Sequence, residues 1–486
     1  MYEYRDDAKV GRLREMSKTG IKLRGLLVLL IIGYLLISGC ARKLEAPVPT
    51  PFPTPTLSPP TDTTPPPQIA GLLAVNAYDG RINLWWDKSS AEDFDHYNVY
   101  TLQSKITDVS GITPVHRIND ISITNYQITG LKDGTNYYFA ITAVDKNGNE
   151  NKQVTTVSAV STPMPRGKVD PELHVDVCQP DKVWAGTTLL PDNHNLQRPR
   201  IIEVNMLGEI IWEYIVPENL RLVPDMGLNP GFDVELLSNN NILFVSPGRG
   251  IYEIDRKGNI IWQYSTAKIS HDADRLPNGN TIFVFGDEDQ KSDAQVTEIN
   301  PKGEVVWNWY ARDHFDKSPY KDIYDQGWTH TNAVTRLTNG NTLISLRNFK
   351  SVVEVDPQGA VVRIIGEGIL GSVHDPQILA NGNLLATIVR AGEIGKAPCV
   401  RAVEIELQTG EIVWQFEAAP RWTLPPVRDA NRLPNGNTLV TGSSAIVETS
   451  PQGGIVWVLK LQGVTLTRGE ESARGFYKAE RIGANR

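Results

Sequence analysis

The stretch Trp328–Asp356, WTHTNAVTRLTNGNTLISLRNFKSVVEVD, contains the pattern that decides the fold. Short runs of apolar and β-branched residues flank the Asn339-Gly340 pair, and another run follows at 352–355. An Asn-Gly pair suits a tight β-hairpin because both central residues of that turn need positive φ. The stretch therefore predicts two strands joined by a hairpin turn, followed by a third strand.

The same pattern recurs before and after this stretch. A second copy runs from His271 to Trp307 and adds a Lys-Gly turn and a fourth strand. Matching turns and fourth-strand tryptophans lie at Asn239-Asn240, Asn278-Gly279, Asn339-Gly340, Asn381-Gly382 and Asn435-Gly436, and at Trp212, Trp262, Trp307, Trp414 and Trp457. Four antiparallel strands per repeat are typical of a β-propeller blade, so the pattern predicts an all-β, six-bladed β-propeller over residues 170–486. A strand within 475–482 is a candidate for closing the ring.

The repeat geometry also predicts that polar residues meet at one mouth of the propeller channel. The first strand of each blade lines this channel. The residue at the start of that strand, here called its head, stands seven residues before the Asn-Gly turn. The second strand runs back and ends on the same face. Six polar residues lie at or beside these strand ends: His271, His330, Asn332, Arg347, His374 and Arg428.

Two interpretations of these residues compete. A histidine that begins a strand can be a structural residue satisfied by the backbone. However, Phe232 and Asn332 fill the same position, so the fold does not require histidine there, and we interpret the cluster as a functional site. The residue after the head is repeatedly an aspartate, which indicates a structural role: Asp233, Asp272, Asp375 and Asp429. The histidines outside the pattern are expected at the surface or in loops: His174, His194 and His314.

Residues 68–165 predict a separate small β-sandwich. Short alternating runs at 71–75, 81–86, 96–102, 122–129 and 137–144 are separated by turn signals, a spacing that favours antiparallel strands. The run Leu131–Tyr137, LKDGTNY, resembles the tyrosine corner of a fibronectin type III domain. Trp85 or Trp86 would be its core tryptophan. We expect this domain to be a spacer or adhesion module without chemistry of its own.

Residues 1–40 predict an export signal. Basic residues precede an apolar run at 26–37, which is shorter than the roughly 20 residues of a membrane-spanning helix. The run ends in Ile37-Ser38-Gly39-Cys40, which resembles a bacterial lipobox and implies a lipid-modified Cys40 on the periplasmic or extracellular side of a membrane. An uncleaved membrane anchor is the alternative. Residues 41–67, rich in Pro and Thr, predict an extended linker.

The composition excludes some partners and leaves the cysteines open. The chain has 486 residues and a formal net charge of −8, which makes nucleic acid and anionic lipid poor partners. Cys178 and Cys399 could form a disulfide in an exported compartment, or they could remain free buried thiols.

Residues 170–486 resemble the bacterial arylsulfotransferase family, most specifically in Trp328-Thr-His-Thr-Asn-Ala-Val. That family moves a sulfuryl group from a phenolic sulfate ester to another phenol, without a nucleotide donor. Its catalytic pattern is a His in one blade, His-x-Asn followed by Arg in the next, and a nucleophilic His in the blade after that. The resemblance therefore implies His271, His330, Arg347 and His374 as catalytic residues, His374 as the nucleophile and Asn332 as a residue that binds or orients.

The residue types suit this chemistry in their own right. A sulfate ester is a monoanion whose transfer spreads charge over the equatorial oxygens, which positioned cations stabilise. Arg347 offers a fork of donors, and a neutral imidazole at His374 can attack sulfur and hold the sulfuryl group. His271 or His330 can protonate the leaving phenolate and later deprotonate the acceptor. Arg428 either adds positive potential for substrate binding or lies on the surface.

Two other interpretations stay open. Three histidines could bind a metal ion, but the neighbouring arginine would oppose a cation, so we expect no metal and no cofactor. The sequence contains neither a Gly-rich phosphate loop nor the Cys-x-Pro-x-Arg run of formylglycine sulfatases. The rival function is a non-catalytic surface-binding or adhesion lipoprotein, in which the cluster binds an anion.

Replacing Cys40 with Ser should leave unprocessed precursor, because the lipid is attached to the cysteine thiol before cleavage. Gel mobility and labelling with a fatty-acid analogue check this, and only the unaltered chain should take up the label. Normal processing of the unaltered chain without lipid label would contradict the lipoprotein prediction.

Overall fold

The computed structural model of the protein describes residues 62–221, 232–367, 370–390, 399–417, 427–466 and 474–484. Within these ranges the secondary structure is almost entirely β, which confirms the predicted class. Three single-turn helices interrupt it: η1 (Glu218–Leu220), η2 (Ala311–Asp313) and η3 (Tyr320–Asp322). No helix in these ranges is long and apolar enough to cross a bilayer. The predicted export signal with Cys40 and most of the linker lie outside the described residues.

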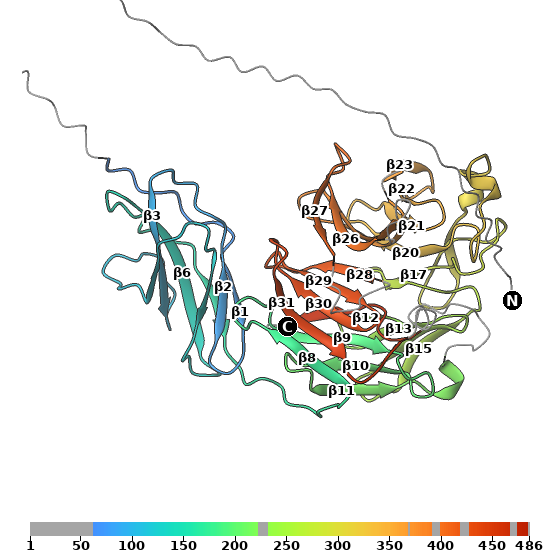
Figure 1. Cartoon of the computed structure of the whole chain (residues 1–486), viewed down its shortest axis with the longest axis horizontal. Helices are drawn as coiled ribbons and strands as arrows, with labels where there is room; N and C mark the ends of the chain where they lie inside the picture. The colour runs from blue at the N-terminus through green and yellow to red at the C-terminus, as the bar shows by residue number, and fades with distance from the viewer. Residues whose placement is uncertain are drawn as a thin grey trace, which may run out of the picture. The chain divides into compact units, whose positions relative to one another are not determined.

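The first domain consists of two antiparallel sheets (Figure 1, blue to teal). One sheet contains β1 (Leu73–Asn76), β2 (Ile82–Trp85) and β5 (Asn125–Ile128). The other contains β4 (His116–Ile118), β3 (Phe94–Leu102), β6 (Asn136–Asp145) and β7 (Val157–Val160). The five predicted strands are present, and β4 and β7 are two short strands that the alternation of the sequence did not indicate.

The core of this domain forms around Trp86, which is 4% exposed and packs with Ile82 and Phe139. Of the two candidate core tryptophans, the structure therefore selects Trp86. The backbone N–H of Lys132 donates to the Tyr137 hydroxyl over 3.3 Å, which is the contact expected of a tyrosine corner.

The described residues after 170 form six antiparallel sheets, numbered here in chain order. The first contains β9 (Gly186–Asp192), β10 (Arg200–Val204), β11 (Ile210–Ile215) and β32 (Glu480–Gly483). The second contains β12 (Asp233–Leu236), β13 (Ile242–Ser246), β14 (Gly250–Ile254) and β15 (Ile260–Ser265). The third contains β16 (Ala273–Arg275), β17 (Thr281–Val284), β18 (Val296–Ile299) and β19 (Val305–Trp309).

The remaining three sheets repeat this order of strands. The fourth contains β20 (Thr331–Arg336), β21 (Thr342–Leu346), β22 (Ser351–Val355) and β23 (Val361–Ile365). The fifth contains β24 (Ser372–Ile378), β25 (Leu384–Arg390), β26 (Cys399–Ile405) and β27 (Ile412–Phe416). The sixth contains β28 (Val427–Arg432), β29 (Thr438–Gly442), β30 (Ala445–Thr449), β31 (Ile455–Leu461) and, at its edge, β8 (Leu173–Cys178).

The six sheets follow one another around a closed ring. Apolar side chains pack between neighbours, as Ile282 of the third sheet does with Ile344 of the fourth. Leu439 of the sixth sheet and Leu190 of the first belong to one such cluster, so the last sheet packs on the first. Two strand pairings complete the closure: β8 pairs with β31, and the C-terminal β32 pairs with β9 (Figure 1, red beside green). The candidate closing strand is therefore present.

Tryptophans of the fourth strands link neighbouring sheets. In the second sheet, Trp262 Nε1 donates to the carbonyl of Pro301 in the third over 2.9 Å. Arg275 of β16 lies over the same indole at 4.7 Å and pairs with Glu253 of the second sheet at 3.1 Å. Similar arginine–tryptophan stacking occurs at Arg256/Trp212, Arg336/Trp307, Arg432/Trp414 and Arg481/Trp457. These contacts join apolar packing, a cation–π contact and a charge-assisted bond in one unit.

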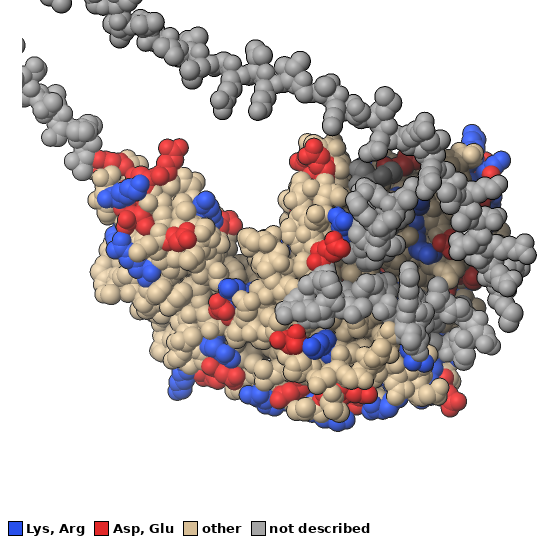
Figure 2. All heavy atoms as spheres, in the orientation of Figure 1, with Lys and Arg blue, Asp and Glu red and all other residues tan. Residues whose placement is uncertain are grey.

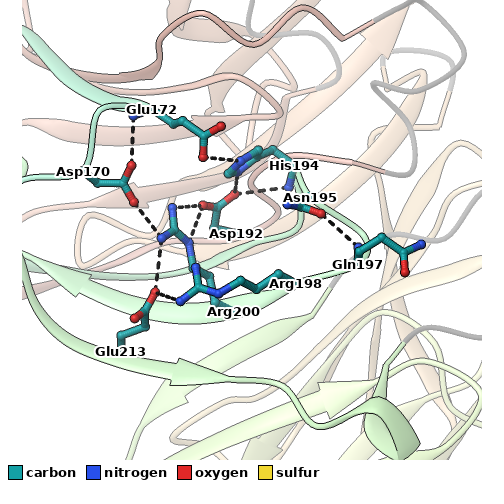
Figure 3. A network of polar contacts seen from close by, with 9 residues as sticks. All are labelled: Asp170, Glu172, Asp192, His194, Asn195, Gln197, Arg198, Arg200 and Glu213. Atoms are coloured by element: carbon teal, nitrogen blue, oxygen red, sulfur yellow. Dashed lines mark hydrogen bonds and ion pairs between the residues drawn. The ribbon is translucent and has the colours of Figure 1, made fainter.

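A buried network holds the first sheet together (Figure 3). Arg200 of β10 is 3% exposed and lies between carboxylates. Its guanidinium is 2.7 Å from Asp170, 2.8 Å from Asp192 and 3.2 Å from Glu213. The backbone of Asp192 also pairs with Phe476, four residues before the start of β32. The network therefore fixes the strand end to which the C-terminal segment attaches.

His194 belongs to this network. It lies in the loop after β9, as one of the two expected alternatives had it, but it is buried rather than at the surface. The side chain is 9% exposed, with Nδ1 2.6 Å from Asp192 and Nε2 3.1 Å from Glu172. Burial opposes its charge, but Asp192 and Glu172 outweigh burial and raise the pKa of His194. By contrast, His174 and His314 are exposed as expected, and Cys178 is a half-buried free thiol.

Replacing Arg200 with Met should lower the free energy of unfolding by about 3–5 kcal/mol, because it leaves the buried Asp170 without its cation and the fully buried Asp192 with His194 alone. Arg198 is the matched control, since its side chain is 48% exposed and also pairs with Glu213. Arg198→Met should cost at most about 1 kcal/mol. Urea unfolding of both variants checks this, and equal costs would contradict the role given to the network.

Candidate active site

The three predicted site histidines lie together at one end of the inner strands. His271 and His330 precede β16 and β20, and His374 lies within β24. The imidazole centroids of His271 and His330 are 5.0 Å apart, and those of His271 and His374 are 6.4 Å apart. Residues more than a hundred positions apart in the chain are thus brought together by the inner-strand heads of three consecutive sheets.

Hydrogen bonds fix two of the rings. His330 Nδ1 lies 2.8 Å from the carbonyl of Gln326, so Nδ1 donates and Nε2 carries the free lone pair when the ring is neutral. His271 Nδ1 lies 2.7 Å from Ser270 Oγ. His330 also has a φ of 46°, a conformation that residues other than glycine adopt at a cost. His271 and His330 are buried, whereas His374 is half-buried and meets solvent.

Burial and neighbouring cations keep the three rings neutral. Burial, followed by the charge of Arg347, lowers the pKa of His330 to about 3. Burial and the neighbouring His330, His374 and arginines hold the pKa of His271 well below its ordinary value. For His374, burial and the charges of Arg428 and Arg347 lower the pKa in the same direction. At neutral pH the site therefore contains unprotonated imidazoles beside permanent positive charges.

The two predicted arginines both reach this site. Arg347 follows β21, and its guanidinium is 3.3 Å and 3.4 Å from the carbonyl and carboxylate of Asp325, a largely exposed residue. These are long contacts for a guanidinium and leave most of its donors available. Arg428 is 9% exposed, with its Cζ 5.1 Å from the ring of Tyr477. Of the two alternatives for Arg428, the structure therefore supports a place in the site.

Asn332 connects two of the sheets at this end. Its Nδ2 donates to the carbonyl of Val373 over 3.0 Å, and Ser345 Oγ donates to the same carbonyl over 2.9 Å. The amide thus fixes the backbone directly before His374. Its Oδ1 is buried without a hydrogen-bond partner among the described residues. An unsatisfied buried acceptor is costly, and this cost falls directly beside the site.

The sequence analysis missed two residues of the site, Tyr477 and Lys478. They precede β32, the inner strand of the first sheet, as His271 and Asp272 precede β16. The Tyr477 ring lies 6.4 Å from that of His271. A signal was present: YKAERI at 477–482 repeats the spacing of HDADRL at 271–276 and RDANRL at 428–433. Because no Asn-Gly turn follows Tyr477, a search based on that turn did not find it.

The fold and the site together define an all-β protein with six antiparallel sheets after residue 170 and a cationic, histidine-rich site at the ends of their inner strands. Residues 204–369 match the family model described as Arylsulfotransferase (ASST), and residues 65–158 match that of the fibronectin type III domain. Both predicted resemblances are confirmed by these matches. The first match contains His271, His330, Asn332 and Arg347.

Several solved structures show a limited similarity to parts of this chain. A protein of unknown function from Bacteroides caccae is 18% identical with a TM-score of 0.42, over 61% of this chain and 98% of that one. A catalytically inactive virginiamycin B lyase from Staphylococcus aureus with quinupristin is 13% identical with a TM-score of 0.36, over 58% and 86%. The sixth fibronectin type III domain of a human protein is 15% identical with a TM-score of 0.18, over 22% and 97%. Among curated protein sequences, none matches this chain.

The depressed pKa of His330 predicts a stability that depends on pH. Its folded value of about 3 lies below the unfolded value of about 6.5, so the unfolded chain binds more protons between these limits. Stability should therefore fall as pH drops from about 6.5 towards 3. His330→Asn, which tolerates positive φ, should make the urea midpoint less sensitive to pH in this range.

His194 is the matched control with the opposite sign. The pKa of His194 is higher in the folded chain than in the unfolded chain. Its contribution to stability is therefore present at pH below the unfolded pKa and is lost as pH rises through the folded pKa. The unaltered protein should therefore lose stability as pH rises above the unfolded pKa of His194, and His194→Gln should not show this loss. Below that pH the variant should respond to pH as the unaltered protein does. If His330→Asn unfolds with the same pH dependence as the unaltered protein, the buried neutral imidazole is refuted.

Proposed function

We propose that this protein transfers a sulfuryl group from an aryl sulfate ester to a phenolic acceptor, through a sulfo-histidine formed at His374. The arylsulfotransferase match supports sulfuryl transfer as the class of reaction. The observation that carries the finer proposal is the half-buried, neutral imidazole of His374 beside the half-buried Arg347 and the buried Arg428. In this proposal the six sheets are the six blades of a propeller, and the site is one mouth of its channel.

In the first half-reaction a ring nitrogen of His374 attacks the sulfur of the ester. A sulfur–nitrogen bond forms while the bond between sulfur and the phenolic oxygen breaks, and the phenolate takes up a proton from His271 or His330. In the second half-reaction the acceptor phenol gives its proton to the same base and attacks sulfur. The sulfur–nitrogen bond then breaks and His374 returns to its starting state.

The arginines supply the electrostatic part of this reaction. Charge spreads over the sulfuryl oxygens in the transition state, and Arg347 offers a planar fork of donors for two of them. Arg428 adds a second positive charge in a buried setting, where such a charge acts more strongly than in water. Asn332 supports His374 through the carbonyl of Val373.

The low pKa of the histidines is compatible with their role as proton donors. The empty site disfavours imidazolium because it is buried and already cationic. A bound ester brings a negative charge next to the rings, and a negative charge raises the pKa of a neighbouring histidine. The proton for the leaving phenolate is therefore taken up when the substrate binds.

Small anionic and phenolic molecules are the partners that this account requires. The face of the molecule in Figure 2 mixes Lys and Arg with Asp and Glu, and the net charge is −8. Non-specific binding to nucleic acid depends on a basic surface, so we do not propose it. We also propose that a lipid on Cys40 holds the protein at the outer side of a membrane, on the basis of Ile37-Ser38-Gly39-Cys40.

Turnover of a chromogenic aryl sulfate with and without added phenol tests the proposal. Initial rates are measured at several concentrations of both substrates. Double-reciprocal plots against donor concentration should be parallel lines, as in ping-pong kinetics, because the first phenol leaves before the acceptor binds. His374→Ala should abolish transfer, and Arg347→Ala should lower kcat/KM by about 100- to 1000-fold, as loss of a transition-state donor does.

The exposed histidine at position 314 provides the control variant, since His314→Ala should keep full activity. Normal turnover by His374→Ala, or kinetics that require both substrates to be bound together, would refute the mechanism. Binding of an aryl sulfate without turnover would favour the rival function, an anion-binding surface protein.

A further inference from the structure

A ring of buried and half-buried carboxylates lies next to the histidines. Asp272 and Asp375 follow His271 and His374 in the chain. Asp233 is the first residue of β12 and holds the equivalent position in the second sheet. All three carboxylates converge on Lys478, whose Nζ is 2.5 Å from Asp272, 3.2 Å from Asp375 and 3.3 Å from Asp233. One ammonium group is thus shared by the inner strands of three sheets.

Most of these aspartates are needed by the fold. Asp233 accepts the backbone N–H of Ala273 over 3.1 Å, and Asp272 accepts that of Val334 over 2.7 Å. Asp429 accepts the N–H of Ala479 over 2.9 Å. Each bond joins the inner strand of one sheet to that of another, two residues beyond the head. The ring therefore places negative charge under the site for a structural reason, and that charge needs a counterion.

Lys478 occupies the place that an aspartate holds in four of the other sheets. Its side chain is only 13% exposed. Burial alone would lower the pKa of Lys478, but Asp233, Asp272 and Asp375 outweigh burial and raise it well above the ordinary value. The ammonium group is therefore permanently charged.

Further groups face this lysine from the strands around it. The carboxylates on the inner strands are Asp233, Glu235, Asp272, Asp274, Asp375 and Asp429. Glu480 lies two residues further along its own strand, and the site side presents His271, His374 and Arg428. Carboxylates outnumber the ammonium group. Burial raises the pKa of Asp233 to about 8 and holds the pKa of Asp274 and Asp429 well above the ordinary value, so part of the ring is protonated.

We propose that Lys478 is a positioning residue of the site, whose ammonium group offsets the aspartate ring so that His271 and His374 stay neutral and an anionic ester can bind above them. The catalytic part of this inference rests on the proposed function, whereas the charge balance between lysine, aspartates and imidazoles does not. Without Lys478, the structural aspartates would favour imidazolium and repel the ester.

Asp375 makes the charge balance testable. Its carboxylate pairs with Lys478 and is hydrogen-bonded to the carboxyl group of Asp429, and no backbone N–H among the described residues donates to it. Its φ of 45° is one that asparagine tolerates well. Asp375→Asn therefore removes one negative charge from the ring with little structural cost, and the pair Lys478→Met with Asp375→Asn removes one charge of each sign.

The experiment follows the imidazole ¹⁵N signals of His271 and His374 by NMR as a function of pH in the histidine-labelled full-length protein. Lys478→Met should raise both titration midpoints by about one pH unit, the size expected for a charge several ångströms away at an effective dielectric near 20. Asp375→Asn should lower them, the double variant should return them towards the unaltered values, and Lys478→Arg should leave them in place.

Aryl sulfate turnover is measured on the same proteins. The acid limb of kcat/KM should move to higher pH in Lys478→Met and return in the double variant, a rescue that loss of packing would not show. Unchanged midpoints in Lys478→Met and Asp375→Asn would overturn the inference, and so would a double variant no better than Lys478→Met. If Lys478→Met does not fold, the midpoints of Asp375→Asn and of the double variant still test the inference. Shifted midpoints in a protein without turnover would support the inference while refuting the proposed function.

Discussion

The structure depends on one pairing between distant parts of the chain, that of β32 with β9. β32 is the inner strand of the first sheet. Without it, Leu190 and the apolar residues around it would be exposed to solvent. The same pairing brings Tyr477 and Lys478 to the heads of the inner strands, where the histidines lie. Folding and assembly of the site are therefore coupled, since loss of the C-terminal strand would remove the counterion beneath the site and the partner of Arg428 at once.

The chemistry of the site follows from where charge is buried. Rings that are neutral because of burial and neighbouring cations are nucleophiles and bases that require no proton loss at neutral pH. The same cations attract a monoanionic ester. The aspartates below would work against both effects if Lys478 did not offset them. A buried charge network that serves the fold thus also sets the electrostatic conditions for the reaction.

Much of this arrangement could be predicted from the sequence, because its repeats are local. Asn-Gly turns and alternating runs mark the hairpins around Asn339-Gly340, and a fixed offset from the turn placed His271, Asn332, His374 and Arg428 on one face. The family resemblance then implied roles for five of the site residues. All-β architecture and both family matches agree with that analysis.

What escaped prediction depends on contacts between residues far apart in the sequence. The burial and pairing of His194 were not predicted, because tertiary structure brings Glu172 to this loop residue beside Asp192. The burial of Arg428 is decided by Tyr477, which lies beyond the last turn signal. The three-residue strand β4 is too short to show an alternating pattern.

The claim on which the account rests is that His374 carries the sulfuryl group between two phenols. Brief incubation of the protein with aryl sulfate alone, followed by proteolysis and mass spectrometry at mildly alkaline pH, tests it most directly. The account predicts one added sulfuryl group, about 80 Da by its formula, on the peptide that contains His374, and its removal on addition of a phenol. A sulfuryl group on another residue, or phenol release with no adduct at any time, would contradict it.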